Sequence, residues 1–261
     1  MAATAERLSA GEIYERVQSN AEEELGRSWS ALAFSGLGAG LAMGFTALGV
    51  AAGLSILGEG RWQEFAATML YPIGFIAVIV GRAQLFTENT LFPVVLTLQR
   101  GDRATLLDTA RLWGVVFAAN ILGALVFAVL AISGGGLEQP IGDRMVTLGA
   151  GAVHHPFATV VVSGVFGGWL VALVAWLVTA SHHTIGQVAI IWLLTFLLGL
   201  AHFAHCIASS DEALCAVVNG TIGVSAYGVW LAAATIGNII GGVVIVAVLN
   251  YGQVRPDTER G

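Results

Sequence analysis

The sequence predicts an all-α membrane protein with six transmembrane helices, built as two inverted halves of three helices each, in which the second and fifth helices are broken. Of its 261 residues, 56% are hydrophobic and 11% are charged, whereas soluble domains carry about 25% charged residues. The run Met145–Ser210 contains no Asp, Glu, Lys or Arg, yet it holds all six histidines. A bilayer accounts for both observations, because its hydrocarbon core penalises charge and a histidine can stay neutral.

Runs without charged residues show where the spans lie. A bilayer is crossed by about 20 apolar residues, so the longest run fits two spans joined at His182 and His183, and the runs together accommodate about six. One transmembrane domain is therefore expected over residues 28–254, between a leader (1–27) and a tail (255–261). The runs are Ser28–Gly58, Phe65–Gly81, Asn89–Gln99, Leu112–Leu137, Met145–Ser210 and Ala213–Val254.

The leader is acidic and lacks the apolar core of a secretory signal peptide. Its residues Ile13, Val17 and Leu25, with Tyr14 and Ala21 nearby, favour a short amphipathic helix on the cytoplasmic surface. Such a helix is either a plain solvated leader or a segment that binds a partner.

The basic residues, all of them arginines, indicate the orientation. With six spans both ends lie on one side, and only Arg61 and Arg144 fall on the other, while Arg82 falls within a span. The positive-inside rule therefore predicts two cytoplasmic termini and a multi-pass protein of the inner, cytoplasmic membrane. The net charge of −6 comes from the tails, and no nucleic-acid partner is expected. The arginines on the side of the termini are Arg7, Arg16, Arg27, Arg100, Arg103, Arg111, Arg255 and Arg260.

The two halves of the chain resemble each other. The segment Ala119–Gly123 in the third span matches Gly237–Gly241 in the sixth, and a tryptophan lies upstream of each, at Trp113 and Trp230. Three spans is an odd number, so the second half must be inverted relative to the first. Inverted repeats are typical of channels and transporters whose site lies at the interface of the repeats.

The second and fifth spans are interrupted at equivalent places. In the second span, the stretch Gly81–Thr90 contains several polar and charged residues and is followed by Pro93. In the fifth span, the stretch Gly199–Glu212 also becomes polar before the apolar run that begins at Ala213. A helix that stops and restarts in the membrane is tolerated where it lines a cavity. These paired interruptions therefore predict a permeation site.

Three short motifs stand out: Leu85-Phe86-Thr87, His154-His155-Pro156-Phe157 and Phe203-Ala204-His205-Cys206-Ile207-Ala208. With these motifs the chain resembles the formate/nitrite transporter family, over nearly its whole length. The strings Glu12-Ile13-Tyr14-Glu15 and Glu22-Glu23-Glu24-Leu25 are similar to a divergent branch of that family.

The resemblance implies a homopentamer of aquaporin-like six-helix protomers, each with its own pore for small monovalent anions of weak acids, such as formate, nitrite, hydrosulfide, acetate or lactate. By position, His205 corresponds to the central histidine of the family and Thr87 to the threonine that hydrogen-bonds it. Leu85 falls at the inner hydrophobic constriction, and Phe75 and Leu198 are expected at the outer one.

Four positions depart from the family pattern. Ala204 replaces a common Glu, Ala152 replaces a Lys, and Ser209 and Gly168 replace asparagines. These changes remove groups that attract or bind anions, so the identity of the anion stays open, as does the choice between a passive channel and a proton-coupled carrier.

A proton relay through His205 is our hypothesis for the chemistry. A bare anion in an apolar constriction is strongly disfavoured, by about 10 kcal/mol or more without partners, and protonation removes most of that penalty. His205 would pass a proton to the anion, Thr87 would fix its tautomer, and Leu85, Phe75 and Leu198 would exclude water. The alternative is a packing histidine that binds a backbone carbonyl.

Other residues of the two interruptions belong to the candidate pathway. His202, three residues before His205, is either a second proton site or a vestibule residue, and Ser209 lies on the same path. Arg82 and Glu88 are charges near the first interruption. In one interpretation Arg82 forms a structural ion pair, either with Glu88 or with Asp211 or Glu212 of the other half; we call such an ion pair a pin. In the other interpretation Arg82 attracts anions.

Two other function classes remain as alternatives. A neutral-solute channel for water or glycerol would suit the fold, but no paired Asn-Pro-Ala motif is present. A membrane enzyme or carrier that binds metal could use His202, His205 and Cys206, but the acidic ligands and nucleophile motifs of such sites are missing. We therefore expect no enzyme activity, no cofactor, no resident metal, and no disulfide between Cys206 and Cys215.

Overall fold

A computed structural model of the protein describes residues 7–258, and for residues 255–258 it describes the backbone alone. Residues 1–6 of the leader and 259–261 of the tail, including Arg260, lie outside this range. Every regular element between residues 7 and 258 is a helix, so the prediction of an all-α protein is confirmed.

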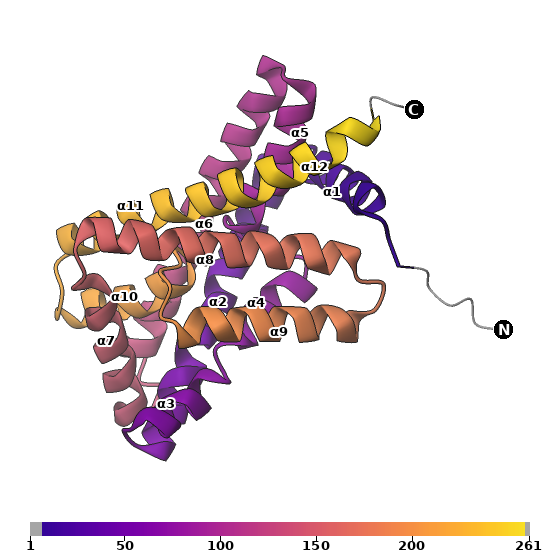
Figure 1. The fold of residues 1–261 in the computed structure, drawn as a ribbon. Helices are drawn as coiled ribbons and strands as arrows, with labels where there is room; N and C mark the ends of the chain where they lie inside the picture. Colours follow the sequence, from indigo (N-terminus) through magenta and orange to yellow (C-terminus); the bar gives the residue numbers. More distant parts are fainter. Residues whose placement is uncertain (1–6, 259–261) are drawn as a thin grey trace.

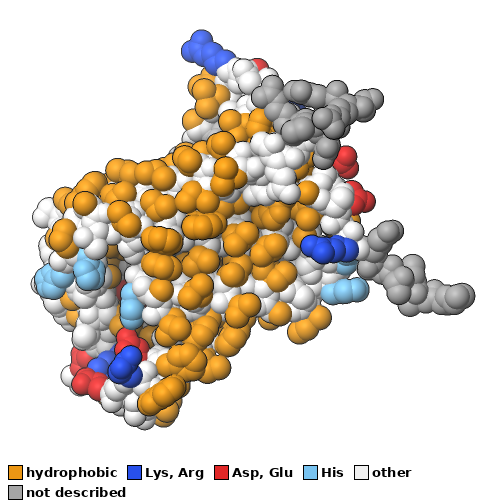
Figure 2. Space-filling model, in the orientation of Figure 1, with side chains coloured by type: hydrophobic (Ala, Val, Ile, Leu, Met, Phe, Trp, Pro, Cys, Tyr) orange, Lys and Arg blue, Asp and Glu red, His pale blue; other side chains and the backbone are white. Residues whose placement is uncertain are grey.

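Five helical stretches in the described range are apolar and long enough to cross a membrane. They are α2 (Trp29–Leu57), α3 with α4 (Arg61–Thr68 and Pro72–Val80), α6 (Arg103–Ser133), α8 (Phe157–Ala180), and α11 with η2 and α12 (Val224–Ile239, Ile240–Val248 and Leu249–Thr258). A further apolar helix, α9 (Thr184–Leu200), is shorter and is followed by α10 (Ala208–Asn219). Hydrophobic side chains cover much of the face of the bundle that Figure 2 shows, and the charged side chains on that face lie toward the ends of the bundle.

Both predicted interruptions are present. The helix α4 ends at Val80, and only a short 3-10 helix, η1 (Glu88–Thr90), precedes α5 (Phe92–Arg100). Pro93 lies in the first turn of α5, where the missing N–H of proline is harmless. In the fifth stretch α9 ends at Leu200 and α10 begins at Ala208.

The leader forms the amphipathic helix α1 (Ala10–Leu25), which begins at a capping box of Ser9 and Glu12. Its buried face carries Tyr14, Val17 and Ala21, and it packs against α5, α8 and α12. Both described ends of the chain lie on one side of the bundle with the α8–α9 turn (Figure 1). We call this the terminal side, and we call the opposite side, which carries α3 and α7, the far side.

Two elements were not expected from the sequence. The helix α7 (Gln139–Val153) lies between the third and fourth apolar stretches and packs against α10 and α2. Its Gly149 touches the backbone of α10 so closely that a methyl group would overlap the Glu212 carbonyl oxygen. The second element is the π-helix η2, which continues α11 with wider hydrogen-bond spacing.

Candidate functional site

The side chains of Thr87 and His205 meet at the centre of the bundle. Thr87 Oγ1 lies 2.8 Å from His205 Nε2, and both residues are fully buried. Thr87 stands in the non-helical segment after α4, and His205 stands in the segment between α9 and α10. The two interruptions therefore meet at one imidazole.

Backbone amides at the start of α10 determine which ring nitrogen of His205 carries the proton. Nδ1 accepts hydrogen bonds from Ile207 N at 3.3 Å and from Ala208 N at 2.9 Å. An acceptor nitrogen carries no proton, so a neutral ring holds its proton on Nε2 and donates it to Thr87 Oγ1. His205 is thus a neutral donor in this geometry, and its partners are amides and a hydroxyl rather than a backbone carbonyl.

Apolar side chains enclose the ring. Phe75 packs edge-on against His205 with ring centroids 5.2 Å apart, and Phe75, Leu85 and Leu198 have no exposed surface. We expected all three residues at constrictions from the sequence. The structure places Phe75 against His205 and buries Leu85 and Leu198 in the same apolar cluster as Phe75.

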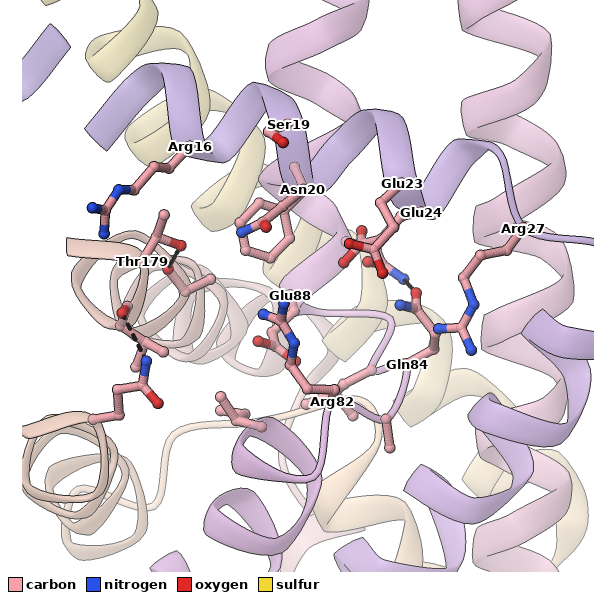
Figure 3. A pocket seen from close by; sticks show the side chains of 18 of the residues that line it. Arg16, Ser19, Asn20, Glu23, Glu24, Arg27, Arg82, Gln84, Glu88 and Thr179 are labelled. Atoms are coloured by element: carbon pink, nitrogen blue, oxygen red, sulfur yellow. Dashed lines mark hydrogen bonds between the residues drawn. The ribbon is translucent and has the colours of Figure 1, made fainter. Parts of the chain in front are cut away.

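A cavity lies on each side of this constriction. On the far side, a cavity of about 580 Å³ is lined by Leu198, Ala204 and Ser209, among others; we call it the far cavity. On the terminal side, a cavity of about 290 Å³ is lined by Gln84 and Leu85, among others (Figure 3); we call it the terminal cavity. Leu85 borders one cavity and Leu198 the other, and the buried His205 lines neither.

An asparagine holds the first interruption in place. Asn120 of α6 accepts a hydrogen bond from Phe86 N at 2.9 Å and donates to Gly36 O at 2.7 Å and Gln84 O at 2.9 Å. Ser35 Oγ accepts a further bond from Gln84 N at 3.1 Å. Non-helical backbone in an apolar bundle needs such partners, because it would otherwise be buried unsatisfied.

Asn238 of α11 holds the second interruption in the same way. It accepts from Cys206 N at 2.8 Å and donates to Gly164 O at 2.8 Å and Ala204 O at 2.9 Å, while Ser163 Oγ accepts from Ala204 N at 2.9 Å. The sequence comparison of the halves contained both asparagines, but their role in fixing the loops was not foreseen. An asparagine within a charge-free apolar run was the available signal.

The expected pin between the halves does not form. Arg82 lines the terminal cavity, whereas Glu212 lines the far cavity, and Asp211 is buried with neither carboxylate oxygen hydrogen-bonded. Arg82 and Glu88 share the terminal cavity, but the ion pairs found among the described residues do not include Arg82. The expectation fails because the two interruptions open toward opposite sides of the bundle.

His202 lies outside α9, so it does not share a helix face with His205. Its Nε2 is 3.1 Å from Glu64 Oε1 at the far cavity, and its side chain is exposed. Ser209 Oγ is 3.5 Å from His205 N, from which it accepts a weak hydrogen bond. Ser209 thus borders the far cavity directly beside the central residue.

The departures from the family pattern occupy two environments. Ala152 and Ala204 line the far cavity. Gly168 instead packs against Asn238, and a methyl group there would overlap the Asn238 carbonyl oxygen. A larger residue at 168 would therefore clash with α11, so the glycine serves a helix crossing.

Glu24 of the leader helix is a cavity residue that sequence reasoning did not identify. It lines the terminal cavity with Arg27, Arg82 and Glu88 (Figure 3). Burial raises the pKa of the Glu24 carboxyl to about 7, while the Gln84 side chain and Arg27 act in the opposite direction. Only the acidic string at the end of the leader hinted at this position.

The described residues contain no group of three or more His, Cys, Asp or Glu side chains placed to hold a metal ion. Cys206 and Cys215 are both buried and free. His202 and His205, which the metal alternative requires together, lie in different surroundings, one exposed and one enclosed.

Comparisons with known proteins identify relatives of the chain. A family model described as formate/nitrite transporter matches residues 11–252. The inner membrane protein YfdC of Escherichia coli (strain K12) is 34% identical over 253 residues, which cover 94% of this chain and 79% of that protein. A probable formate transporter of Methanothermobacter thermautotrophicus is 27% identical over 199 residues, covering 70% and 72%.

The fold is also found in solved structures. A structure described as a pentameric formate channel with formate bound superposes with a TM-score of 0.73 at 18% identity, covering 92% of this chain and 99% of that chain. A structure described as an FNT family ion channel gives a TM-score of 0.73 at 19% identity, covering 94% and 96%. These likenesses show a shared fold.

Proposed function

Because this chain belongs to the formate/nitrite transporter family, we propose that it is a membrane channel or transporter for small monovalent anions of weak acids. The observation that carries the proposal is the buried pair of Thr87 and His205, which lies between two cavities on opposite sides of the bundle. The Methanothermobacter relative is described as a probable formate transporter and the similar structure as a formate channel, which supports the substrate class.

The architecture that suits this function is a six-span inverted repeat. In this arrangement α9 and α10 together make the fifth span, as α3, α4 and α5 make the second. The matched hydrogen bonds of Asn120 and Asn238 support the repeat. One pore then runs through each protomer, and five protomers assemble as in the structure described as a pentameric formate channel.

The terminal side is the cytoplasmic side in this account. The protein is an inner-membrane protein with several spans, and the arginine excess near the termini supports two cytoplasmic ends. The leader (1–27) and tail (255–261) then flank the transport domain of residues 28–254. Residues of α1 line the terminal cavity on its cytoplasmic side. The far cavity opens outward.

The proton relay through His205 requires a movement of the loop. To take up a second proton, the ring must receive it on Nδ1, which two amides of α10 now occupy as donors. Two N–H groups facing a third would repel it, so the loop between α9 and α10 must release the ring before it can become an imidazolium. The proton then passes to the anion, and the neutral acid crosses the apolar constriction beside Leu85 and Leu198.

A neutral His205 is the second candidate, and the same hydrogen bonds favour it. In this version the ring never gains a proton but offers Nε2–H through Thr87 as a donor, and the acid acquires its proton in the far cavity. His205→Asn separates the two versions, because an asparagine can accept and donate but does not titrate. Retained flux in this variant supports the neutral ring, and lost flux supports the relay.

A panel of solutes tests the proposed function itself. Purified protein in proteoliposomes should take up formate, nitrite, hydrosulfide, acetate or lactate, faster at pH 6 than at pH 8, because the acid form carries the flux. Swelling in glycerol should match empty liposomes. Glycerol or water flux without uptake of any anion would replace the proposal with a neutral-solute channel.

A further inference from the structure

Two residues after α4 and two residues after α9, the backbone turns left-handed at a residue that is not glycine. Arg82 has φ 57° and His202 has φ 51°, and they are the only non-glycine residues with positive φ in the described part of the chain. Their amides bond to the carbonyls of Ile79 and Gly199, three residues back, at 3.2 and 3.1 Å. The same turn therefore ends both half-helices.

Glycine is the default residue for this conformation, because a side chain is strained there. A larger residue persists at such a position where its side chain contributes something that glycine cannot. Both residues can carry a positive charge, although the rest of the two loops differs in sequence. We take the shared strain as a sign that the cationic side chains have a function.

Each of the two residues stands at a different cavity. Arg82 lines the terminal cavity, where the other charged groups facing it are Arg16 and Arg27 with Glu23, Glu24 and Glu88 (Figure 3). His202 lines the far cavity, where Glu64, Glu212, His155 and Tyr71 are the other titratable groups. Three arginines thus balance three glutamates in one cavity, whereas the other holds two glutamates, two histidines and no arginine.

We propose that Arg82 and His202 are the capture groups for a small monovalent anion at the two mouths of the pore, Arg82 on the terminal side and His202 on the far side. The inference rests on the proposed function and adds the residues that admit the anion. Each side chain offsets carboxylates that would otherwise repel the substrate from its mouth.

The two mouths then respond differently to pH. Arginine keeps its charge at every physiological pH, whereas histidine side chains change charge between about pH 5 and 8. Acid on the far side therefore adds a positive charge beside Glu64 and lowers the repulsion of the anion. Capture at the far mouth strengthens through His202 as that side is acidified, whereas Arg82 contributes the same charge at pH 6 and pH 8. A pH response of the terminal mouth comes instead from Glu24, because burial raises the pKa of its carboxyl to about 7.

Formate uptake into membrane vesicles of each orientation tests the proposal. Right-side-out vesicles present the far mouth and inverted vesicles the terminal mouth. In the wild type the KM for formate at the far mouth should fall roughly fivefold between pH 8 and pH 6, the effect of one unit charge in a solvated mouth. In His202→Gly the KM should equal the wild-type KM of pH 8 at both pH values. In His202→Arg it should equal the lower wild-type KM of pH 6 at both.

Arg82→Gly should raise the KM in inverted vesicles by a similar factor and leave it unchanged in right-side-out vesicles. Neither glycine variant should lower the melting temperature, because glycine relieves the strained backbone. Matched controls are His154→Gln and Arg103→Gln, at exposed positions outside both cavities, and they should behave as the wild type.

Three results would overturn the inference. Normal formate flux with an unchanged KM in the glycine variants refutes the capture role alone and leaves the proposed function standing. A pH response that disappears in His155→Gln but persists in His202→Gly moves the role to another residue. Absence of anion flux in the wild type refutes the proposed function and the inference together.

Discussion

At His205 the backbone decides which nitrogen is protonated. The amides of Ile207 and Ala208 occupy Nδ1, so Nε2 and its proton face Thr87 Oγ1. Desolvation makes any unpaired polar group costly in this constriction, which is why each ring nitrogen has a partner. The Thr87 hydroxyl and the two amides thus fix the orientation of the ring.

Thr87→Val removes this partner while keeping the shape of the side chain. The buried Nε2–H is then unpaired, which should destabilise the protein by about 1–3 kcal/mol and lower its melting temperature and anion flux. Thr87→Ser, which retains the hydroxyl, is the control and should keep most of both. A valine variant with wild-type stability and flux would show that the hydrogen bond has no role.

Predictions for single residues differed in how well they could be made. The meeting of Thr87 and His205 followed from the resemblance to a family, because composition alone cannot pair residues from two distant interruptions. The pairing of Arg82 with Asp211 or Glu212 failed, because the sequence does not reveal toward which side each interruption opens. The left-handed backbone at Arg82 and His202 was also hidden, since neither residue is a glycine that would mark such a turn.

Among the elements, the two interruptions could be predicted from the sequence, whereas the helix α7 and the π-helix η2 could not. Polar residues and Pro93 within apolar runs marked the ends of the half-helices. The helix α7 carries apolar residues at helical spacing, Ile141, Met145 and Leu148, but its 15 residues are too few to cross a bilayer, so a pattern of apolar spans did not identify it. The π-helix η2 occupies a uniformly apolar segment, in which nothing in the sequence signals a change of hydrogen-bond spacing.

The crossing of α8 and α11 gives a prediction for Gly168. A methyl group there overlaps the Asn238 carbonyl oxygen, so Gly168→Ala should push α11 away and cost about 1–3 kcal/mol. Gly114→Ala on α6 is the control, because no atom lies within contact of its added methyl group, and alanine favours the helix. Equal melting temperatures for the two variants would contradict the close crossing.

The leader helix gives a prediction about pH. Burial raises the pKa of the Glu24 carboxyl to about 7, above its ordinary value of 4.5. A carboxyl with a raised pKa favours the docked helix most below pH 4.5, and this contribution is lost as the pH rises through 7. The protection factors of the α1 amides in hydrogen exchange, which remove the intrinsic dependence of exchange on pH, should therefore be higher at pH 5.5 than at pH 8.

Glu24→Gln should remove most of that difference and protect α1 at pH 8. The neighbouring Glu23→Gln serves as the control and should leave the pH dependence intact. The role of Glu24 in docking would be refuted by equal protection of α1 at both pH values in the wild type.

At the scale of the whole molecule, an apolar exterior surrounds the buried polar pair of Thr87 and His205. Hydrophobic side chains cover much of the face shown in Figure 2, as expected for contact with lipid or with neighbouring protomers. Inside, Asn120 and Asn238 each hydrogen-bond one backbone N–H and one carbonyl of an interruption, which helps the chain to place non-helical segments at its centre. The result is a buried apolar site with the His205 imidazole at its centre.

Formate flux in proteoliposomes carrying the wild type or His205→Ala tests the central claim most directly. If anions cross at the meeting point of the two interruptions, the alanine variant should lose proton-coupled uptake while it remains folded as the same oligomer. Uptake by His205→Ala at the wild-type rate, with the same dependence on pH, would contradict a pathway through this residue.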